Sequence, residues 1–182
     1  MKLYTIGHSN HSIDKFIRLL EDNNITTLVD VRTAPYSRHH PQFNRDNLEF
    51  VLAQREIQYA FAGKYLGGRP TDPMCYKSRV LPGENADFLH EVDYREVMKR
   101  TWFIRGIERL LEMAAEHTTA IMCSEENPAE CHRHHLIAQY LIENHPEIQV
   151  YHIRGDGTIF GARSIRETVD KPVVAQPALI DL

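Results

Sequence analysis

The sequence has few cysteines, and their spacing forms no disulfide framework. Only three occur in 182 residues, at Cys75, Cys123 and Cys131. Disulfide-stapled secreted domains need an even set of cysteines at short intervals. We therefore expect free thiols and a reducing, cytoplasmic location.

Long apolar runs and excess positive charge are also missing. No stretch is apolar over the ~20 residues that a membrane-spanning helix needs, and no signal peptide is recognisable. The formal net charge is -4, so no global positive field attracts the chain to nucleic acid or lipid. We expect no membrane partner, and any polyanion site must be local.

Hydrophobic periodicity predicts strands that alternate with helices. Strands are expected at 2–6, 25–31, 57–61, 119–123 and 148–153, and helices at 12–23, around 48–52, at 92–116 and after 128. This alternation is typical of a three-layer, Rossmann-like α/β domain around a mostly parallel sheet. We expect one domain over residues 1–163, followed by a C-terminal tail over 164–182.

The densest group of reactive side chains lies between residues 119 and 135. An apolar strand ends at Cys123, an acidic loop with Glu125 follows, and Asn127 with Pro128 marks a helix start. Parallel α/β sheets bind ligands at the carboxyl ends of their strands. We therefore predict a crevice at the end of this strand.

A helical projection of the residues after Pro128 selects two of them. At roughly 100° per residue, Arg133 shares the inward face of Leu136, whereas Cys131 falls on the opposite face. This register makes Cys123 and Arg133 the pocket residues. We predict that Arg133 meets an anion at the sheet edge; the alternative is a carboxylate of the preceding loop.

The first two strands also end in polar residues. Because the ends of parallel strands share one edge, His8, Ser9, Asp30 and Arg32 should approach the same crevice. Asp30 and Arg32 lie on one face of their strand. They form either a structural ion pair or an acid/base group beside an anion-binding arginine. The second interpretation predicts that Asp30→Asn loses function and keeps most of its thermal stability.

Several short motifs occur in a specific order along the chain. They are Thr5-Ile-Gly-His-Ser9, Val29-Asp-Val-Arg32, Pro35 with Ser37-Arg38, Leu66-Gly-Gly68, and Cys123-Ser-Glu125 followed by Cys131-His-Arg133. Together they resemble the domain of unknown function family 488, over the chain to about residue 155. The resemblance implies a Rossmann-like α/β fold and supplies no reaction. It marks Cys131 and His132 as candidate site residues, whereas the helical projection selects neither of them.

Cys123 is either a small buried apolar residue or a reactive thiol. A helix start and Arg133 lower a thiol pKa, whereas the neighbouring Glu125 raises it. The reactive alternative predicts that Cys123 is the most reactive thiol. Asp30 or Glu125 would then be the acid/base group, with His8 beside them.

The order of a Val-Asp-Val-Arg strand and a later strand–cysteine–loop–helix unit is similar to that of rhodaneses and cysteine-dependent phosphatases. The loop here has no glycine to cradle an anion, so this likeness is one of fold.

We expect no metal and no other cofactor. Candidate ligands are present at Cys123, Cys131, His132, His134 and His135. Their spacing matches no common zinc pattern, in which ligands are paired two to four residues apart. Metal binding by these residues stays an alternative, with solvated histidines as the simpler account.

Two functions remain open. The first is an enzyme, a hydrolase or transferase, that acts on a small or nucleotide-like anionic substrate. The second is a non-catalytic nucleotide or nucleic-acid binding module that uses the basic loop at 33–45 and the segment at 63–80; steep salt dependence would identify it. The predicted substrate-binding residues are Ser9, Arg32, Arg38, Tyr65, Gly68, Arg69, Cys131, His132 and Arg133.

Overall fold

The apolar runs form one six-stranded sheet in the order β3-β2-β4-β1-β5-β6. The computed structural model of the chain describes residues 1–165. The strands are β1 (Lys2–Gly7), β2 (Thr27–Asp30), β3 (Gln58–Phe61), β4 (Thr119–Cys123), β5 (Gln149–Ile153) and β6 (Ile159–Gly161). Neighbours pair in parallel except β5 and β6, which are antiparallel. The predicted α/β class with a mostly parallel sheet is confirmed.

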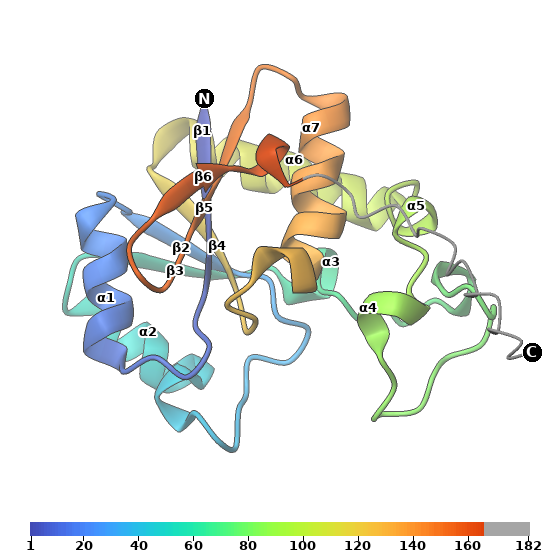
Figure 1. Ribbon diagram of the computed structural model, residues 1–182, viewed down its shortest axis with the longest axis horizontal. Helices are drawn as coiled ribbons and strands as arrows, with labels where there is room; N and C mark the ends of the chain where they lie inside the picture. The colour runs from blue at the N-terminus through green and yellow to red at the C-terminus, as the bar shows by residue number, and fades with distance from the viewer. Residues whose placement is uncertain (166–182) are drawn as a thin grey trace, which may run out of the picture.

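Helices cover both faces of the sheet (Figure 1). One side carries α1 (Ile13–Asp22) and α2 (Arg45–Ala53), and the other carries α6 (Thr101–Glu116) and α7 (Gln139–Asn144). Every residue of β2 and of β4 is buried, as expected for strands covered on both faces. These layers account for the apolar runs in the sequence.

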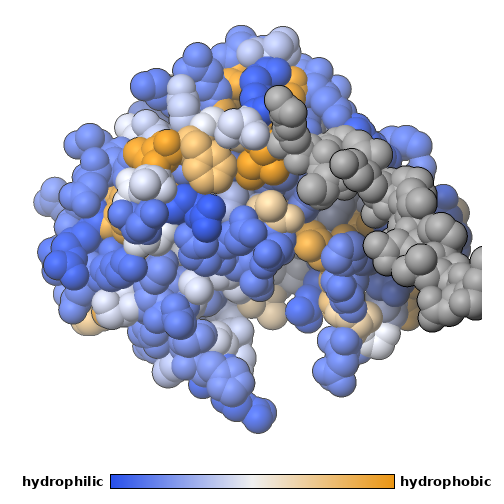
Figure 2. All heavy atoms as spheres, in the orientation of Figure 1, coloured by the Kyte–Doolittle hydropathy of each residue, from blue (hydrophilic) through white to orange (hydrophobic). Residues whose placement is uncertain are grey.

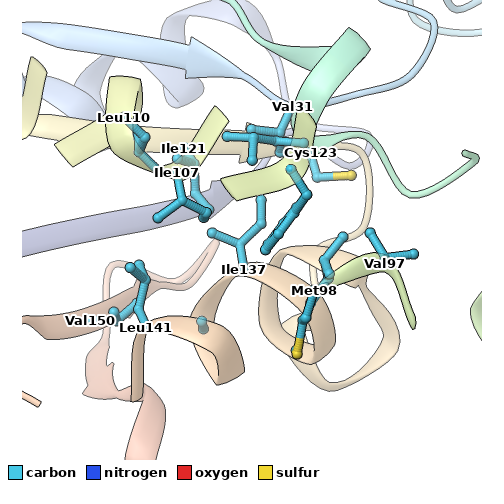
Figure 3. Packing of buried hydrophobic residues seen from close by; sticks show 14 of the residues in the cluster. Val31, Val97, Met98, Ile107, Leu110, Ile121, Cys123, Ile137, Leu141 and Val150 are labelled. Atoms are coloured by element: carbon cyan, nitrogen blue, oxygen red, sulfur yellow. The ribbon is translucent and has the colours of Figure 1, made fainter. Parts of the chain in front are cut away.

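Alternate residues of β4 separate the two cores. Ala120 and Met122 belong to the cluster under α1 and α2, whereas Ile121 and Cys123 belong to the cluster under α6 and α7. Figure 3 shows the second cluster, with Cys123 at its margin beside Val31. The last residue of β4 is therefore both a core residue and an edge residue of the sheet.

The helices around the sheet are shorter and more often interrupted than the hydrophobic periodicity predicted. The helix expected at 92–116 is divided into α5 (Tyr94–Val97) and α6, because Arg100 is extended, with φ -76° and ψ 132°. Between β3 and α5 lie two short helices, α3 (Gly63–Leu66) and α4 (Phe88–Glu91).

The carboxyl end of the described chain adds a hairpin. The N–H of Arg154 donates to the carbonyl of Thr158 across the turn, at 2.9 Å, and aligns β6 with β5. A single 3-10 turn, Ala162–Ser164, follows. The predicted tail lies outside the described residues from 166 onward. Within residues 1–165, no helix is long and apolar enough to cross a membrane.

Candidate functional site

A cavity of about 610 Å³ opens at the carboxyl edge of the sheet. This size lies within the ~300–1,000 Å³ typical of small-molecule sites. The buried lining residues, which form its floor, include Cys123, Cys131 and His132. Its walls come from the loop after β2 and the segment around α4, and Figure 2 shows the surface hollowed between these two projections. The structure thus places a pocket where the strand pattern predicted a crevice.

The chain after β4 does not form the regular helix that was expected. The Asn127 side chain accepts from the Ala129 N–H at 3.2 Å and starts only a 3-10 turn, Pro128–Glu130. Cys131 is then extended, with φ -141° and ψ 140°. A π-helix, Arg133–Ala138, leads into α7. A projection at 100° per residue therefore fails, and its placement of Cys131 away from the pocket is wrong.

Three side chains converge on the pocket floor. The Nδ1 atom of His132 lies 3.6 Å from the Sγ atom of Cys123 and 3.9 Å from that of Cys131. The ligand atoms of all three lie within 4.8 Å of one another. We call Cys123, Cys131 and His132 the cysteine–histidine cluster. Gly68 packs on it, since a Cβ there would lie 2.8 Å from the imidazole.

The opposite side of the imidazole fixes its tautomer. The Nε2 atom of His132 lies 3.2 Å from the carbonyl oxygen of Val31. A carbonyl only accepts, so Nε2 carries the hydrogen of the neutral ring. The unprotonated Nδ1 then faces both sulfur atoms. The imidazole can therefore accept a proton from either thiol or donate its lone pair to a cation.

The two thiols differ in acidity because each one affects the pKa of the other. The hydrogen bond to Cys131, together with burial, raises the pKa of Cys123 well above its ordinary value. Burial also acts to raise the pKa of Cys131, but hydrogen bonding, above all from Cys123, lowers it overall. These directions favour Cys131 over Cys123 as the more acidic thiol of the pair, against the prediction that Cys123 is the more reactive one.

Arg133 points inward, as the helical projection expected, but it does not line the pocket. Its Nη1 and Nη2 atoms donate to the backbone carbonyls of Glu125 and Glu126, the latter at 2.7 Å, and its Nε donates to Thr5 Oγ1 at 3.3 Å. Gly7 permits this packing, because a Cβ there would collide with the Glu125 carbonyl. Arg133 thus binds the backbone of the acidic loop. These carbonyls accept the hydrogen bonds of the guanidinium, so the side chain needs neither an anion nor a carboxylate as partner.

Asp30 and Arg32 form a closed ion pair. The Nη2 of Arg32 lies 2.6 Å from Asp30 Oδ2, and its Nε lies 2.9 Å from Oδ1. The Tyr59 hydroxyl donates to the same carboxylate at 2.9 Å. Asp30 is fully buried and does not line the pocket, whereas the neutralised Arg32 does. The geometry matches the structural alternative rather than an acid/base role for Asp30.

His8 and Ser9 likewise serve the framework. The His8 Nδ1–H donates to the Ser9 carbonyl at 2.9 Å, and its Nε2 accepts from Arg32 at 3.3 Å. The ring stacks on Phe43 with 4.4 Å between centroids. Burial lowers the pKa of His8 to about 4, so the ring is neutral at physiological pH. Neither residue lines the pocket.

The remaining predicted residues divide between the pocket and its surroundings. Gly68, Arg69 and Glu125 line the pocket, whereas Arg38 and Tyr65 are exposed outside it. No hydrogen bond or ion pair within residues 1–165 engages the Glu125 carboxylate. Burial, followed by the proximity of Cys131, raises the pKa of Glu125.

Sequence reasoning missed two aromatic residues of the pocket. Phe88 lies beneath the guanidinium of Arg69, 4.4 Å from it to the ring centre. Tyr94 lines the same pocket as the cluster, and burial, followed by the charges of Cys131 and Cys123, raises its pKa. Phe88 follows the irregular segment after β3, and Tyr94 falls within the helix that was predicted at 92–116. No catalytic pattern marks either residue in the sequence.

The other histidines near the cluster face elsewhere. The Nδ1 of His134 lies 3.1 Å from the Nε2 of His152, and His135 donates to the Ala129 carbonyl at 2.6 Å. Of the five candidate metal ligands in this stretch, only the three of the cluster meet. Their convergence is a property of the fold, because the 3-10 turn and the extended Cys131 return the chain to Cys123.

Fold and site define a three-layer α/β protein with a cysteine–histidine cluster at a ligand-sized pocket. Comparison with protein families matches residues 12–141 to the domain of unknown function DUF488. The match covers more than half of the chain, and the protein belongs to this family. Among curated proteins and among solved structures, none matches the chain. Membership agrees with the motifs and assigns no reaction.

Proposed function

We propose that the protein is an enzyme that acts on a small substrate with an anionic group, and that the cysteine–histidine cluster is its reaction centre. One observation carries the proposal: two sulfurs and an unprotonated imidazole nitrogen meet on the floor of a ligand-sized pocket. Reactive groups that converge in an accessible concave site are the arrangement expected of an active site. Hydrolysis or group transfer is the proposed reaction class.

Arg69 supplies the attraction for an anionic group. Its guanidinium lies over the ring of Phe88 at the pocket wall. No carboxylate within residues 1–165 pairs with it, whereas Arg32 is neutralised by Asp30. An arginine held over an aromatic ring keeps its donors directed outward to a carboxylate or phosphate. We therefore assign the anionic end of the substrate to Arg69.

Glu125 supplies the proton-transfer group. Its carboxylate lines the same pocket as the cluster and is not engaged by any protein donor within the described chain. A general acid or base must reach the reacting atom with a free oxygen. Tyr94 is assigned as a hydrogen-bond donor to the substrate, because it lines the same pocket as the cluster.

A metabolite panel tests this function. The full chain is incubated with phosphorylated and carboxylated metabolites, nucleotides included, and turnover is followed by proton and phosphorus NMR. Arg69→Ala should raise KM with little change in kcat, whereas Glu125→Gln should lower kcat by about 100-fold. Arg38→Ala, outside the pocket, is the matched arginine control. Lack of turnover and of any ligand-induced thermal shift across the panel would count against an enzyme.

The nucleic-acid alternative has less support. Tyr76, an aromatic residue of the 63–80 segment, is 1% exposed, and its hydroxyl donates to the Pro70 carbonyl at 2.6 Å. Each of the two segments keeps one exposed tyrosine, Tyr36 at 70% and Tyr65 at 41%, and only Tyr36 lines the pocket. A binding module would bind single-stranded oligonucleotides with an affinity that falls steeply with salt.

A further inference from the structure

We propose that the cysteine–histidine cluster binds one Zn²⁺-like ion and leaves a fourth coordination position open to the pocket. The ligands are the Sγ atoms of Cys123 and Cys131 and the Nδ1 atom of His132. The inference rests on the proposed function only in taking these residues as the reaction centre. Binding of the ion can be measured whether or not a substrate is known.

The separations within the cluster match tetrahedral coordination. Bond lengths of about 2.3 Å to sulfur and about 2.0–2.1 Å to nitrogen place a sulfur and a nitrogen ligand about 3.6 Å apart. The observed distances from His132 Nδ1 are 3.6 Å to Cys123 and 3.9 Å to Cys131. Little movement is needed to close both sulfur atoms on one ion.

The imidazole is already prepared as a ligand. Its Nε2–H donates to the Val31 carbonyl at 3.2 Å, which turns the Nδ1 lone pair toward the two sulfurs. Metal-bound histidines usually donate the second ring N–H to a carbonyl or carboxylate in this way. Gly68 adds a steric limit from the other side, where a Cβ would lie 2.8 Å from the ring. The orientation of His132 is therefore fixed from two sides.

The ligand set selects the kind of ion. Two thiolates and an imidazole suit Zn²⁺ and similar transition metals, whereas Mg²⁺ and Ca²⁺ prefer oxygen ligands. On binding, the two sulfurs lose their protons, and the resulting two negative charges balance a divalent cation. The guanidinium of Arg133 is held by the carbonyls of Glu125 and Glu126, outside the pocket lining.

The number of protein ligands distinguishes the kind of site. Structural zinc sites are closed by four protein ligands, whereas catalytic sites use three and keep one position open. Within residues 1–165, no fourth cysteine, histidine or carboxylate belongs to the group. All three ligands line the cavity. An ion held there would present its open position to a substrate, and both cysteines would act as ligands rather than nucleophiles.

Cobalt substitution tests the inference directly. The full chain, freed of any affinity tag and of metal, is titrated with Co²⁺ and then with Zn²⁺. We expect one Co²⁺ per chain, a sulfur-to-cobalt charge-transfer band, the visible bands of tetrahedral Co²⁺, and their loss on addition of one equivalent of Zn²⁺. Cys131→Ser and His132→Gln should each weaken binding at least tenfold. Cys75→Ser, which removes the buried cysteine outside the cluster, should bind as the natural chain does.

The contrary results are equally distinct. Absence of the charge-transfer band, or a band that Cys75→Ser removes, would overturn the metal site. If the two cluster variants unfold by circular dichroism, Gly68→Ala provides a variant that leaves all three ligands present and should still weaken binding. Turnover that persists in the metal-free chain, together with no cobalt binding, would overturn the metal site and support the enzyme. Metal binding without turnover of any substrate would support the metal site and count against the proposed enzymatic function.

Discussion

Gly68 and His132 touch at the floor of the pocket. A Cβ at Gly68 would lie 2.8 Å from the Cγ and Nδ1 atoms of the imidazole, closer than side-chain atoms pack. The imidazole has little freedom to yield, because its Nε2 is hydrogen-bonded to the Val31 carbonyl. A glycine at this position therefore maintains the direction in which His132 presents its lone pair.

The first prediction concerns this contact. Gly68→Ala should displace the imidazole and weaken Co²⁺ binding by about tenfold or more, because small ligand movements are costly at a metal site. Cobalt titration measures the effect. Gly161→Ala is the matched control, since a Cβ there meets no atom within 4 Å. Equal affinity of the two variants would show that the glycine does not position the imidazole.

The second prediction concerns the ion pair between Asp30 and Arg32. Asp30→Asn should lower the free energy of unfolding by roughly 3 kcal/mol, because it leaves a buried guanidinium without its counter-charge. Urea denaturation measures the loss. Glu49→Gln, which removes an exposed partner of Arg45, should cost under about 1 kcal/mol. A variant as stable as the natural chain would restore the acid/base interpretation of Asp30.

The local pattern of apolar residues in the sequence was sufficient to predict the layers of the fold. Apolar runs at β2 and β4 and the helical spacing of Phe16, Ile17 and Leu20 in α1 predicted elements that the structure contains. The brief strand β6 was not predicted, because three residues are too few to show a strand period. Periodicity identifies an element only when the element buries a continuous face.

The site could be predicted only in part. The strand end at Cys123 located the pocket, but the position of Cys131 depended on a backbone break that no residue of the turn signals. One extended residue and a π-helix changed the helical register, so Arg133 and Cys131 exchanged their expected roles. The partners of Asp30 depended on tertiary contacts such as the Tyr59 hydroxyl.

The third prediction concerns thiol reactivity in the metal-free chain. Cys131 should be alkylated by iodoacetamide fastest, because the hydrogen bond from Cys123 lowers its pKa and it lines the pocket. Cys75 should react slowest, since it is fully buried and burial raises its pKa. Peptide mass mapping at short times gives the order. Fastest labelling of Cys123 would reverse the assignment, and Zn²⁺ should protect both cluster cysteines.

The last prediction concerns stability in mild acid. Burial lowers the pKa of three histidines below the ordinary 6.5: His8 to about 4, His134 to about 4 and His152 to about 3. The unfolded chain therefore takes up protons first as the pH falls. The stability that the neutral rings provide is complete above pH 6.5 and decreases from there toward pH 4.

The size of this loss can be bounded and measured. Linkage allows one histidine to contribute up to about 1.4 kcal/mol per pH unit in this window. Urea denaturation between pH 7 and pH 5 should show a falling free energy of unfolding, and His152→Gln should make the slope shallower. The exposed His39 is the control, because His39→Gln should leave the slope unchanged. The Glu126–Arg154 pair contributes little in this range, because the stability it provides is lost only as the pH falls from the ordinary Glu pKa of 4.5 toward the folded pKa of about 2. A flat profile in the natural chain would mean that these rings are not held neutral by the fold.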